Sequence, residues 1–138
     1  LQWYADYDGH IDGLLESLVE NLATEQHELR LLSLRLLDDR YRKFHDKNSE
    51  ILATMLLIEQ TPLDLQNSRL LSMHVRRLAS TYKEHSLDPL LRKAVPLYCF
   101  GMLTVKFSKL WEDATAALTQ IAETDGGENV IAEIVFLI

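Results

Sequence analysis

Leucine recurs at helical spacing through the first part of the chain, and this periodicity restricts the possible folds more than any other feature. From a helix start near Asp8, a good N-cap, one stripe carries Ile11, Leu14, Leu15, Leu18, Val19 and Leu22. The acidic residues Asp12, Glu16 and Glu20 fall on the other side. The pattern predicts an amphipathic helix that is buried along one face only.

The segment that follows predicts a helix of a different kind. After a break at residues 24–26, leucines occupy two nearly opposite faces: Leu29, Leu32, Leu36 and Leu37 on one, Leu31 and Leu34 on the other, with Arg30 and Arg35 between them. A helix of this kind needs neighbours on two sides. Stacked helical hairpins meet that need, because each hairpin packs on its own partner and on the next hairpin.

A second hairpin follows the first. Asn48 or Ser49 caps a helix that ends at a Thr61–Pro62 break, and another helix extends from about Gln66 to Tyr82. The packed face of that helix holds Leu70, Leu71, Leu78 and Tyr82, with His74 as an interior polar group whose hydrogen bonds are satisfied. Two hairpins in about eighty residues match the roughly forty-residue period of HEAT and armadillo repeats.

The repeat register between residues 85 and 110 stays open. Asp88–Pro89 starts a helix that extends to about Leu103 but contains Pro96, which must kink the helix or end it early. A further stripe carries Leu110, Trp111, Ala114, Ala117, Leu118 and Ile121. A turn at residues 125–127 then precedes a last helix that begins near Glu128.

Together these segments predict an all-α fold, since five glycines and three prolines in 138 residues favour long helices. We expect a HEAT/armadillo-like α-solenoid segment of about seven helices in antiparallel hairpins. Residues 1–138 form one segment, with a first hairpin at 1–47, a second at 48–84 and further helices at 85–138. The sequence opens without methionine and ends in the apolar run 130–138, so we expect an excerpt whose flanking repeats cover both ends.

Two stretches resemble known families. Residues 14–22 followed by 27–37 resemble a HEAT repeat, with Leu29–Arg30 where the family usually has Val-Arg. The Lys-Phe-Ser-x-Leu-Trp run at 106–111, followed by residues 128–134, resembles the large HEAT-repeat scaffold of the small-subunit processome, the down-regulated in metastasis family. The second resemblance implies a non-catalytic scaffold of the nucleolus, in the nucleus, acting in small ribosomal subunit biogenesis and pre-rRNA processing. Its partners would be proteins of a large assembly and pre-ribosomal RNA.

Two other functions remain open: a HEAT-type adaptor of another pathway, such as transport or signalling, and an independent helical regulatory domain or enzyme fragment. We expect no enzyme, because the sequence lacks a glycine-rich phosphate loop, His-Glu-x-x-His, Cys-x-x-Cys and a nucleophile elbow. The same absences predict no catalytic residue, cofactor, metal or small-molecule substrate.

Cys99 is expected in the core of an intracellular, soluble chain. No apolar stretch approaches the roughly twenty residues that cross a bilayer.

The distribution of charge singles out one candidate contact surface. A net charge of −7 argues against binding nucleic acid by overall charge, yet residues 66–109 hold eight basic and two acidic side chains. Arg69, Arg76 and Lys83 recur every seven residues and form one seam on their helix. This seam, extended by Arg30, Arg35, Arg92 and Lys93, would meet RNA phosphate or an acidic peptide. The alternative is a solvated face, or one paired with the acidic helices of the same solenoid.

We interpret the pairs Asp38–Asp39 and Glu112–Asp113 as helix-end charge, with the second pair in the first turn of its helix.

Overall fold

A computed structural model describes residues 8–84, 86–124, 129 and 131–132 of the chain. Within these residues it is helical and contains no strand. The predicted all-α fold is confirmed, while the predicted turn at 125–127 and most of the helix expected from Glu128 lie outside the described residues. The described α-helices are α2 (Asp8–Glu20), α3 (His27–Tyr41), α4 (Lys47–Gln60), α5 (Ser68–Glu84), α6 (Pro89–Met102) and α7 (Ser108–Glu123). Short 3-10 segments are η1 (Asn21–Ala23), η2 (Arg42–Phe44) and η3 (Leu65–Asn67).

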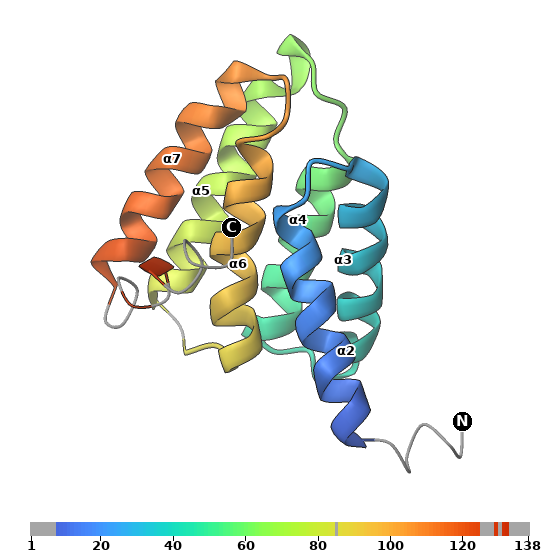
Figure 1. The fold of residues 1–138 in the computed structure, drawn as a ribbon. Helices are drawn as coiled ribbons and strands as arrows, with labels where there is room; N and C mark the ends of the chain where they lie inside the picture. Colours follow the sequence, from blue (N-terminus) through green and yellow to red (C-terminus); the bar gives the residue numbers. More distant parts are fainter. Residues whose placement is uncertain (1–7, 85, 125–128, 130, 133–138) are drawn as a thin grey trace.

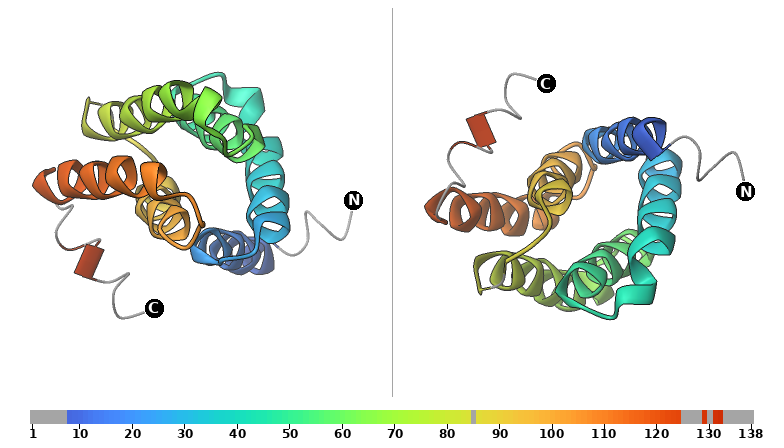
Figure 2. Two further views of the ribbon diagram at one scale, coloured as in Figure 1. Left: turned by 90° about the horizontal axis from the view of Figure 1, so that it is seen from above. Right: turned by 90° about the horizontal axis from the view of Figure 1, so that it is seen from below.

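Consecutive helices lie side by side as hairpins, an arrangement consistent with an all-α solenoid segment (Figure 1). Helix α2 packs on α3, α3 on α4, α4 on α5, α5 on α7, and α7 on α6. Helix α6 also contacts α2 and η1, so the six helices form a ring when viewed along their axes (Figure 2). In a linear stack each repeat contacts only its neighbours, whereas here the first and third hairpins also meet. Membership of the HEAT class stays a prediction.

One cluster of buried apolar side chains extends through all six helices. Aromatic, leucine and alanine side chains interdigitate in it, and such a core stabilises the fold by about 25 cal/mol per Å² of apolar surface removed from water. Its largest fully buried members are Tyr82, Tyr98, Leu22, Leu34, Leu37, Ile51, Leu52, Met55, Leu71, Leu78, Leu91 and Leu97.

Several of the predicted apolar faces are wrong. Helix α3 buries a single face, consisting of Arg30, Ser33, Leu34, Leu37 and Tyr41, while Leu32 and Leu36 are 54% and 45% exposed. Leu14 and Leu70 are exposed as well. Helix α3 contacts both α2 and α4, yet the side that holds Leu32 and Leu36 is left uncovered in the described part of the chain. Leucine spacing shows which residues share a face, but the packing of neighbouring helices decides which face is covered.

Trp111 was expected within the packed stripe of its helix but is 42% exposed. Its indole N–H donates to the carbonyl oxygen of Val105 at 2.6 Å, which fixes the ring over the loop that leads into α7. The other members of the stripe, Leu110, Ala114, Ala117 and Ile121, are buried as predicted, and Leu118 packs against the core.

The start of α4 differs from the predicted cap. Asp46 is the N-cap, and its carboxylate accepts the backbone N–H of Ser49 at 3.1 Å. That hydrogen bond lowers the pKa of Asp46. Asn48 instead accepts the backbone N–H of Asp88 at 2.9 Å and so joins the start of α4 to the start of α6. His45 precedes the cap with a φ of 49°, a left-handed conformation that lets the chain leave η2 and enter α4.

A buried ion pair links α3 to α4. Arg30 Nε donates to Glu59 Oε1 at 2.7 Å and Nη2 donates to Oε2 at 3.2 Å, while Nη1 donates to the carbonyl oxygen of Thr24 at 2.8 Å. His27 Nδ1 lies 2.7 Å from Glu59 Oε2, and the hydroxyl of Tyr98 in α6 donates to Oε1 at 3.4 Å. Burial and the charge of Glu59 raise the pKa of Tyr98 well above its ordinary value. Arg30 is therefore a buried structural residue and does not extend the basic seam.

His74 is buried on the packed side of α5 as predicted, but its hydrogen bonding is not satisfied as predicted. Within the described residues its Nδ1 atom has no hydrogen-bond partner, and the same holds for the hydroxyl of Ser33. Sequence spacing locates a side chain on a helix face but does not supply a hydrogen-bond partner for it.

Helix α6 continues through Pro96 to Met102, close to the predicted end at about Leu103, so the alternative that Pro96 ends the helix early is wrong. Proline has no N–H, so the carbonyl oxygen of Arg92, four residues earlier, loses its usual helical donor. The hydroxyl of Tyr82 in α5 donates to that oxygen at 3.1 Å. A hydrogen bond between two helices thus takes the place of one within α6.

Gly101 allows α6 to approach η1 closely. A β-carbon at this position would overlap the carbonyl oxygen of Leu22 and would lie 3.3 Å from Cδ of Arg30. Gly13 in α2 offers a contrast, because a β-carbon there would have no atom of the described residues within 4 Å. The two glycines differ in packing, although both lie in helices.

We expect Gly101→Ala to lower the free energy of unfolding by about 2–3 kcal/mol, because a backbone oxygen of η1 and the buried Arg30 must move. Gly13→Ala should raise it by about 0.5–1 kcal/mol through helix propensity alone. Urea denaturation followed by circular dichroism measures both. Equal effects of the two substitutions would contradict the close approach of α6 to η1.

We expect Tyr82→Phe to lower the free energy of unfolding by about 1–2 kcal/mol, since it removes a donor from a partly buried carbonyl. In a Pro96→Ala background the alanine N–H can bond to the Arg92 oxygen, so the same substitution should cost less. A double-mutant cycle from urea denaturation gives the coupling. Additive effects would show that the tyrosine hydroxyl does not replace the missing helical bond.

Candidate functional site

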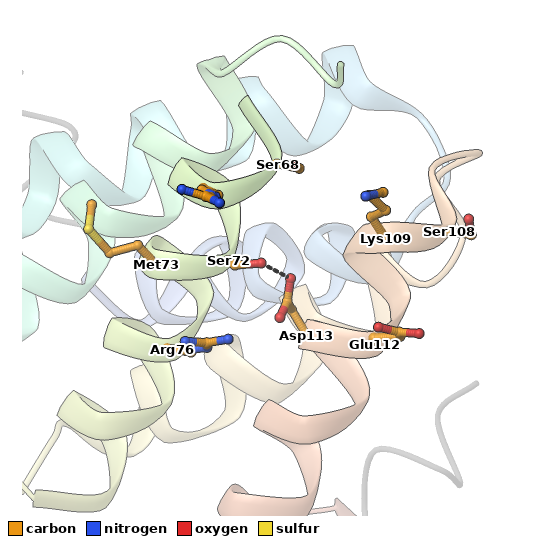
Figure 3. Close-up of a pocket in the computed structure, with 9 residues that line it drawn as sticks. Ser68, Ser72, Met73, Arg76, Ser108, Lys109, Glu112 and Asp113 are labelled. Atoms are coloured by element: carbon orange, nitrogen blue, oxygen red, sulfur yellow. Dashed lines mark hydrogen bonds between the residues drawn. The ribbon is translucent and has the colours of Figure 1, made fainter. Parts of the chain in front are cut away.

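Two of the three predicted seam residues line one groove between α5 and α7. Arg69 and Arg76 lie on α5, exposed, two turns apart, and Lys109 lies opposite them in the first turn of α7. Figure 3 shows Arg76 and Ser72 on one side of the groove and Lys109, Glu112 and Asp113 on the other. The groove has a volume of about 830 Å³. Its lining residues are Ser68, Arg69, Ser72, Met73, Arg76, Ser108, Lys109, Glu112 and Asp113.

The floor of the groove is held by a contact between its two helices. The hydroxyl of Ser72 donates to Oδ2 of Asp113, the dashed bond of Figure 3. Helix α7 begins at Ser108, so Glu112 and Asp113 fall in its second turn and not in the first turn as predicted. Asp113 therefore serves as an acceptor that joins α7 to α5, and the helix-end role expected for the pair is wrong.

The cations of the groove form no ion pair within the part of the chain that the structure describes. No ion pair there includes Arg69, Arg76 or Lys109, although Glu112 and Asp113 line the same groove. Exposed arginine and lysine side chains without partners are free to bind an external anion, and arginine can do so with two parallel hydrogen bonds. The groove has the chemistry of an anion-binding surface.

The remaining predicted contact residues lie elsewhere. Lys83 is exposed near the end of α5, outside the groove lining, and Arg35 is exposed on α3. Arg92 is half-buried with its guanidinium 5.2 Å from the ring centre of Tyr82, a cation–π contact. Lys93 lines a separate cavity of about 620 Å³ that includes Leu15, Arg40 and Phe44. The proposed seam is thus divided, and only its first two members share a site.

Sequence reasoning missed Lys109, Ser72 and Asp113 as parts of this site. Lys109 is forty residues away from Arg69, and no periodicity within one helix can join them. One sequence feature could have indicated the site. The basic stretch at 66–109 changes to an acidic stretch at 110–138 near the start of the helix that forms the second side of the groove.

Two further findings concern metal binding and the single cysteine. They hold no group of histidine, cysteine, aspartate and glutamate side chains that could bind a metal ion. Cys99 is completely buried in α6, and burial raises the pKa of its thiol to about 12. The thiolate is the reactive form of cysteine, so Cys99 is a core residue, as predicted. Among the described helices, none is both long and apolar enough to cross a lipid bilayer.

The described residues form a helical segment with a groove lined by cations that have no ion-pair partner among those residues. Most of this chain is similar to part of one known protein. No family model matches the chain. The chain is 28% identical, over 116 residues, to U3 small nucleolar RNA-associated protein 20 of Saccharomyces cerevisiae. The match includes 84% of this chain and 5% of the yeast protein, so the chain spans only a small part of its relative. This is a distant relationship.

We expect Cys99 to resist thiol reagents such as Ellman's reagent in the folded chain. At pH 8 the rise of its pKa to about 12 lowers the thiolate fraction by about a thousandfold relative to an ordinary cysteine. Labelling in urea should be complete and fast, which serves as the control. Rapid labelling of the folded chain, as judged by circular dichroism, would contradict the burial of α6.

Proposed function

We propose that this chain is a non-catalytic scaffold segment of a large helical-repeat protein in small ribosomal subunit biogenesis and pre-rRNA processing. The observation that carries the proposal is the 28% identity over 84% of the chain to a U3 small nucleolar RNA-associated protein. The resemblance of residues 106–111 to the processome scaffold family points the same way. The proposal places the protein in the nucleolus, among the proteins of a large assembly and pre-ribosomal RNA.

The segment that carries the resemblance has a structural role in the fold. Phe107 is the N-cap residue of α7 and packs against the core, Leu110 is buried, and the Trp111 indole bonds to Val105. The backbone N–H of Phe107 also donates to the carbonyl oxygen of Val105, at 2.9 Å. These contacts set the turn from α6 into α7. The likeness therefore supports a shared architecture, and the residues that bind a partner are to be sought elsewhere.

The mechanism that we propose is the presentation of surface. The helical ring offers several open sites, among them the α5–α7 groove and the cavity beside Lys93. Weak contacts at such sites add up when many segments of one long chain engage one particle, because each later contact forms at high effective concentration. Affinity then depends on the relative placement of the helices, which the core and the buried ion pair maintain.

An adaptor for transport or signalling is the second candidate. The observation in its favour is the cavity of about 620 Å³ between α2, α3 and α6, which Tyr41, Leu90 and the 57% exposed Phe44 line. An apolar anchor of a peptide would suit such a surface. This reading differs from the first in requiring no RNA.

We expect the full-length protein, affinity-purified from cells, to enrich U3 small nucleolar RNA and small-subunit precursor RNA, measured by sequencing, with assembly proteins measured by mass spectrometry. Gly101→Ala should reduce this recovery because it disturbs the segment, and Gly13→Ala should leave it unchanged. A set of transport or signalling proteins without RNA would overturn the proposal in favour of the adaptor.

A further inference from the structure

The α5–α7 groove combines cations that come from distant parts of the chain. Arg69 and Arg76 occupy one wall and Lys109 the other, and none of the three forms an ion pair within the described residues. Surface arginines usually gain little from pairing, but three cations that converge on one hollow repel each other until an anion binds. The groove therefore offers an external anion three cations without ion-pair partners in one place.

The carboxylates of the groove only partly balance these cations. Asp113 accepts the hydroxyl of Ser72, so its charge is held at the floor between the helices. Glu112 lies three residues after Lys109 on α7, yet the two form no ion pair in the described part of the chain. Three cations thus face two carboxylates, and one of those carboxylates is already hydrogen-bonded.

The start of α7 adds to the positive potential. Phe107 is its N-cap and supplies no side-chain acceptor, so no side chain caps the first N–H groups of this helix of sixteen residues. Ser108 and Lys109, its first two residues, line the groove. The positive end of the helix dipole therefore lies beside the three cations and strengthens the attraction for a phosphate.

The composition of the groove favours a nucleic-acid backbone over a peptide. Every lining residue except Met73 is polar or charged, so the groove has no pocket for an apolar anchor residue. Peptide grooves take most of their affinity from such anchors, whereas nucleic-acid interfaces are more polar and more positive. The cavity beside Lys93, which Phe44 and Leu90 also line, has apolar side chains that could receive a peptide anchor, and it lies on another part of the ring.

We propose that this groove binds the phosphate groups of an RNA strand, with Arg69 and Arg76 on one side of the strand and Lys109 on the other. The inference deepens the proposed function, on which it rests for the presence of RNA in the particle. It assigns the RNA contact to α5 and the first turn of α7, and it leaves Lys83, Arg92 and Lys93 outside the contact.

The test is the binding of a fluorescein-labelled single-stranded RNA to the 138-residue chain, measured by fluorescence anisotropy over a range of salt concentrations. The double variant Arg69→Gln/Arg76→Gln should weaken RNA binding about tenfold near 0.1 M salt. It should also make the plot of log K against log salt concentration less steep by about 1.4, because each of the two lost phosphate contacts contributes roughly 0.7 to the slope. The matched control is Arg35→Gln with Lys43→Gln, which removes the same charge from α3 and η2. It should leave the affinity close to that of the unaltered chain.

Glu112→Gln provides a test in the opposite direction, since it removes a negative charge from the groove and should tighten RNA binding. Circular dichroism verifies that each variant is folded. Equal losses in the groove variant and the control, or no gain from Glu112→Gln, would overturn the proposal. Absence of RNA binding together with binding of polyglutamate would overturn it in favour of an acidic protein. Either failure can occur while the full-length protein still enriches U3 RNA, so the groove and the proposed function are tested separately.

Discussion

The buried contact between Arg30 and Glu59 is the constraint on which the rest of the structure depends. A charge removed from water is tolerated only when a partner and hydrogen bonds compensate the lost solvation, and losing one partner of such a pair typically costs about 3–5 kcal/mol. Here the compensating groups come from α3, α4, the turn at Thr24 and Tyr98 of α6. Because all of them must be in place together, the pair sets how these segments lie relative to each other.

The position of α6 follows from that arrangement. Gly101 brings α6 against η1, where a side chain would collide with Leu22, and the approach places α2 and α6 in contact. The ring thereby closes on one side through small residues and buried polar groups. On the other side α5 and α7 pack together, with Ser72 and Asp113 joining them. The cations above that contact stay exposed, so the groove is a consequence of how the ring is built.

Much of the helical layout could be predicted because it depends on local patterns. The breaks at 24–26 and at Thr61–Pro62, the start near Asp8 and the core position of Cys99 agree with the structure. The failures share one cause. Leu32 and Leu36 are exposed because no helix of the described chain covers them. The burial of Arg30 and the continuation of α6 through Pro96 each depend on a residue from another helix. The donor that satisfies Arg92 is Tyr82, ten residues earlier in the chain, and no rule of helix propensity contains that bond.

By itself the sequence determined that the chain is helical, where most helices begin and end, and that positive charge gathers in residues 66–109. These properties arise from interactions between residues a few positions apart, which spacing and composition record directly. Tertiary structure alone decided which leucines are covered, which arginine is buried, and that Arg69 and Arg76 meet Lys109 across a groove. Such contacts join residues some thirty or forty positions apart. They form only when the helices pack, because burial of the apolar core and loss of hydration of the polar groups occur together.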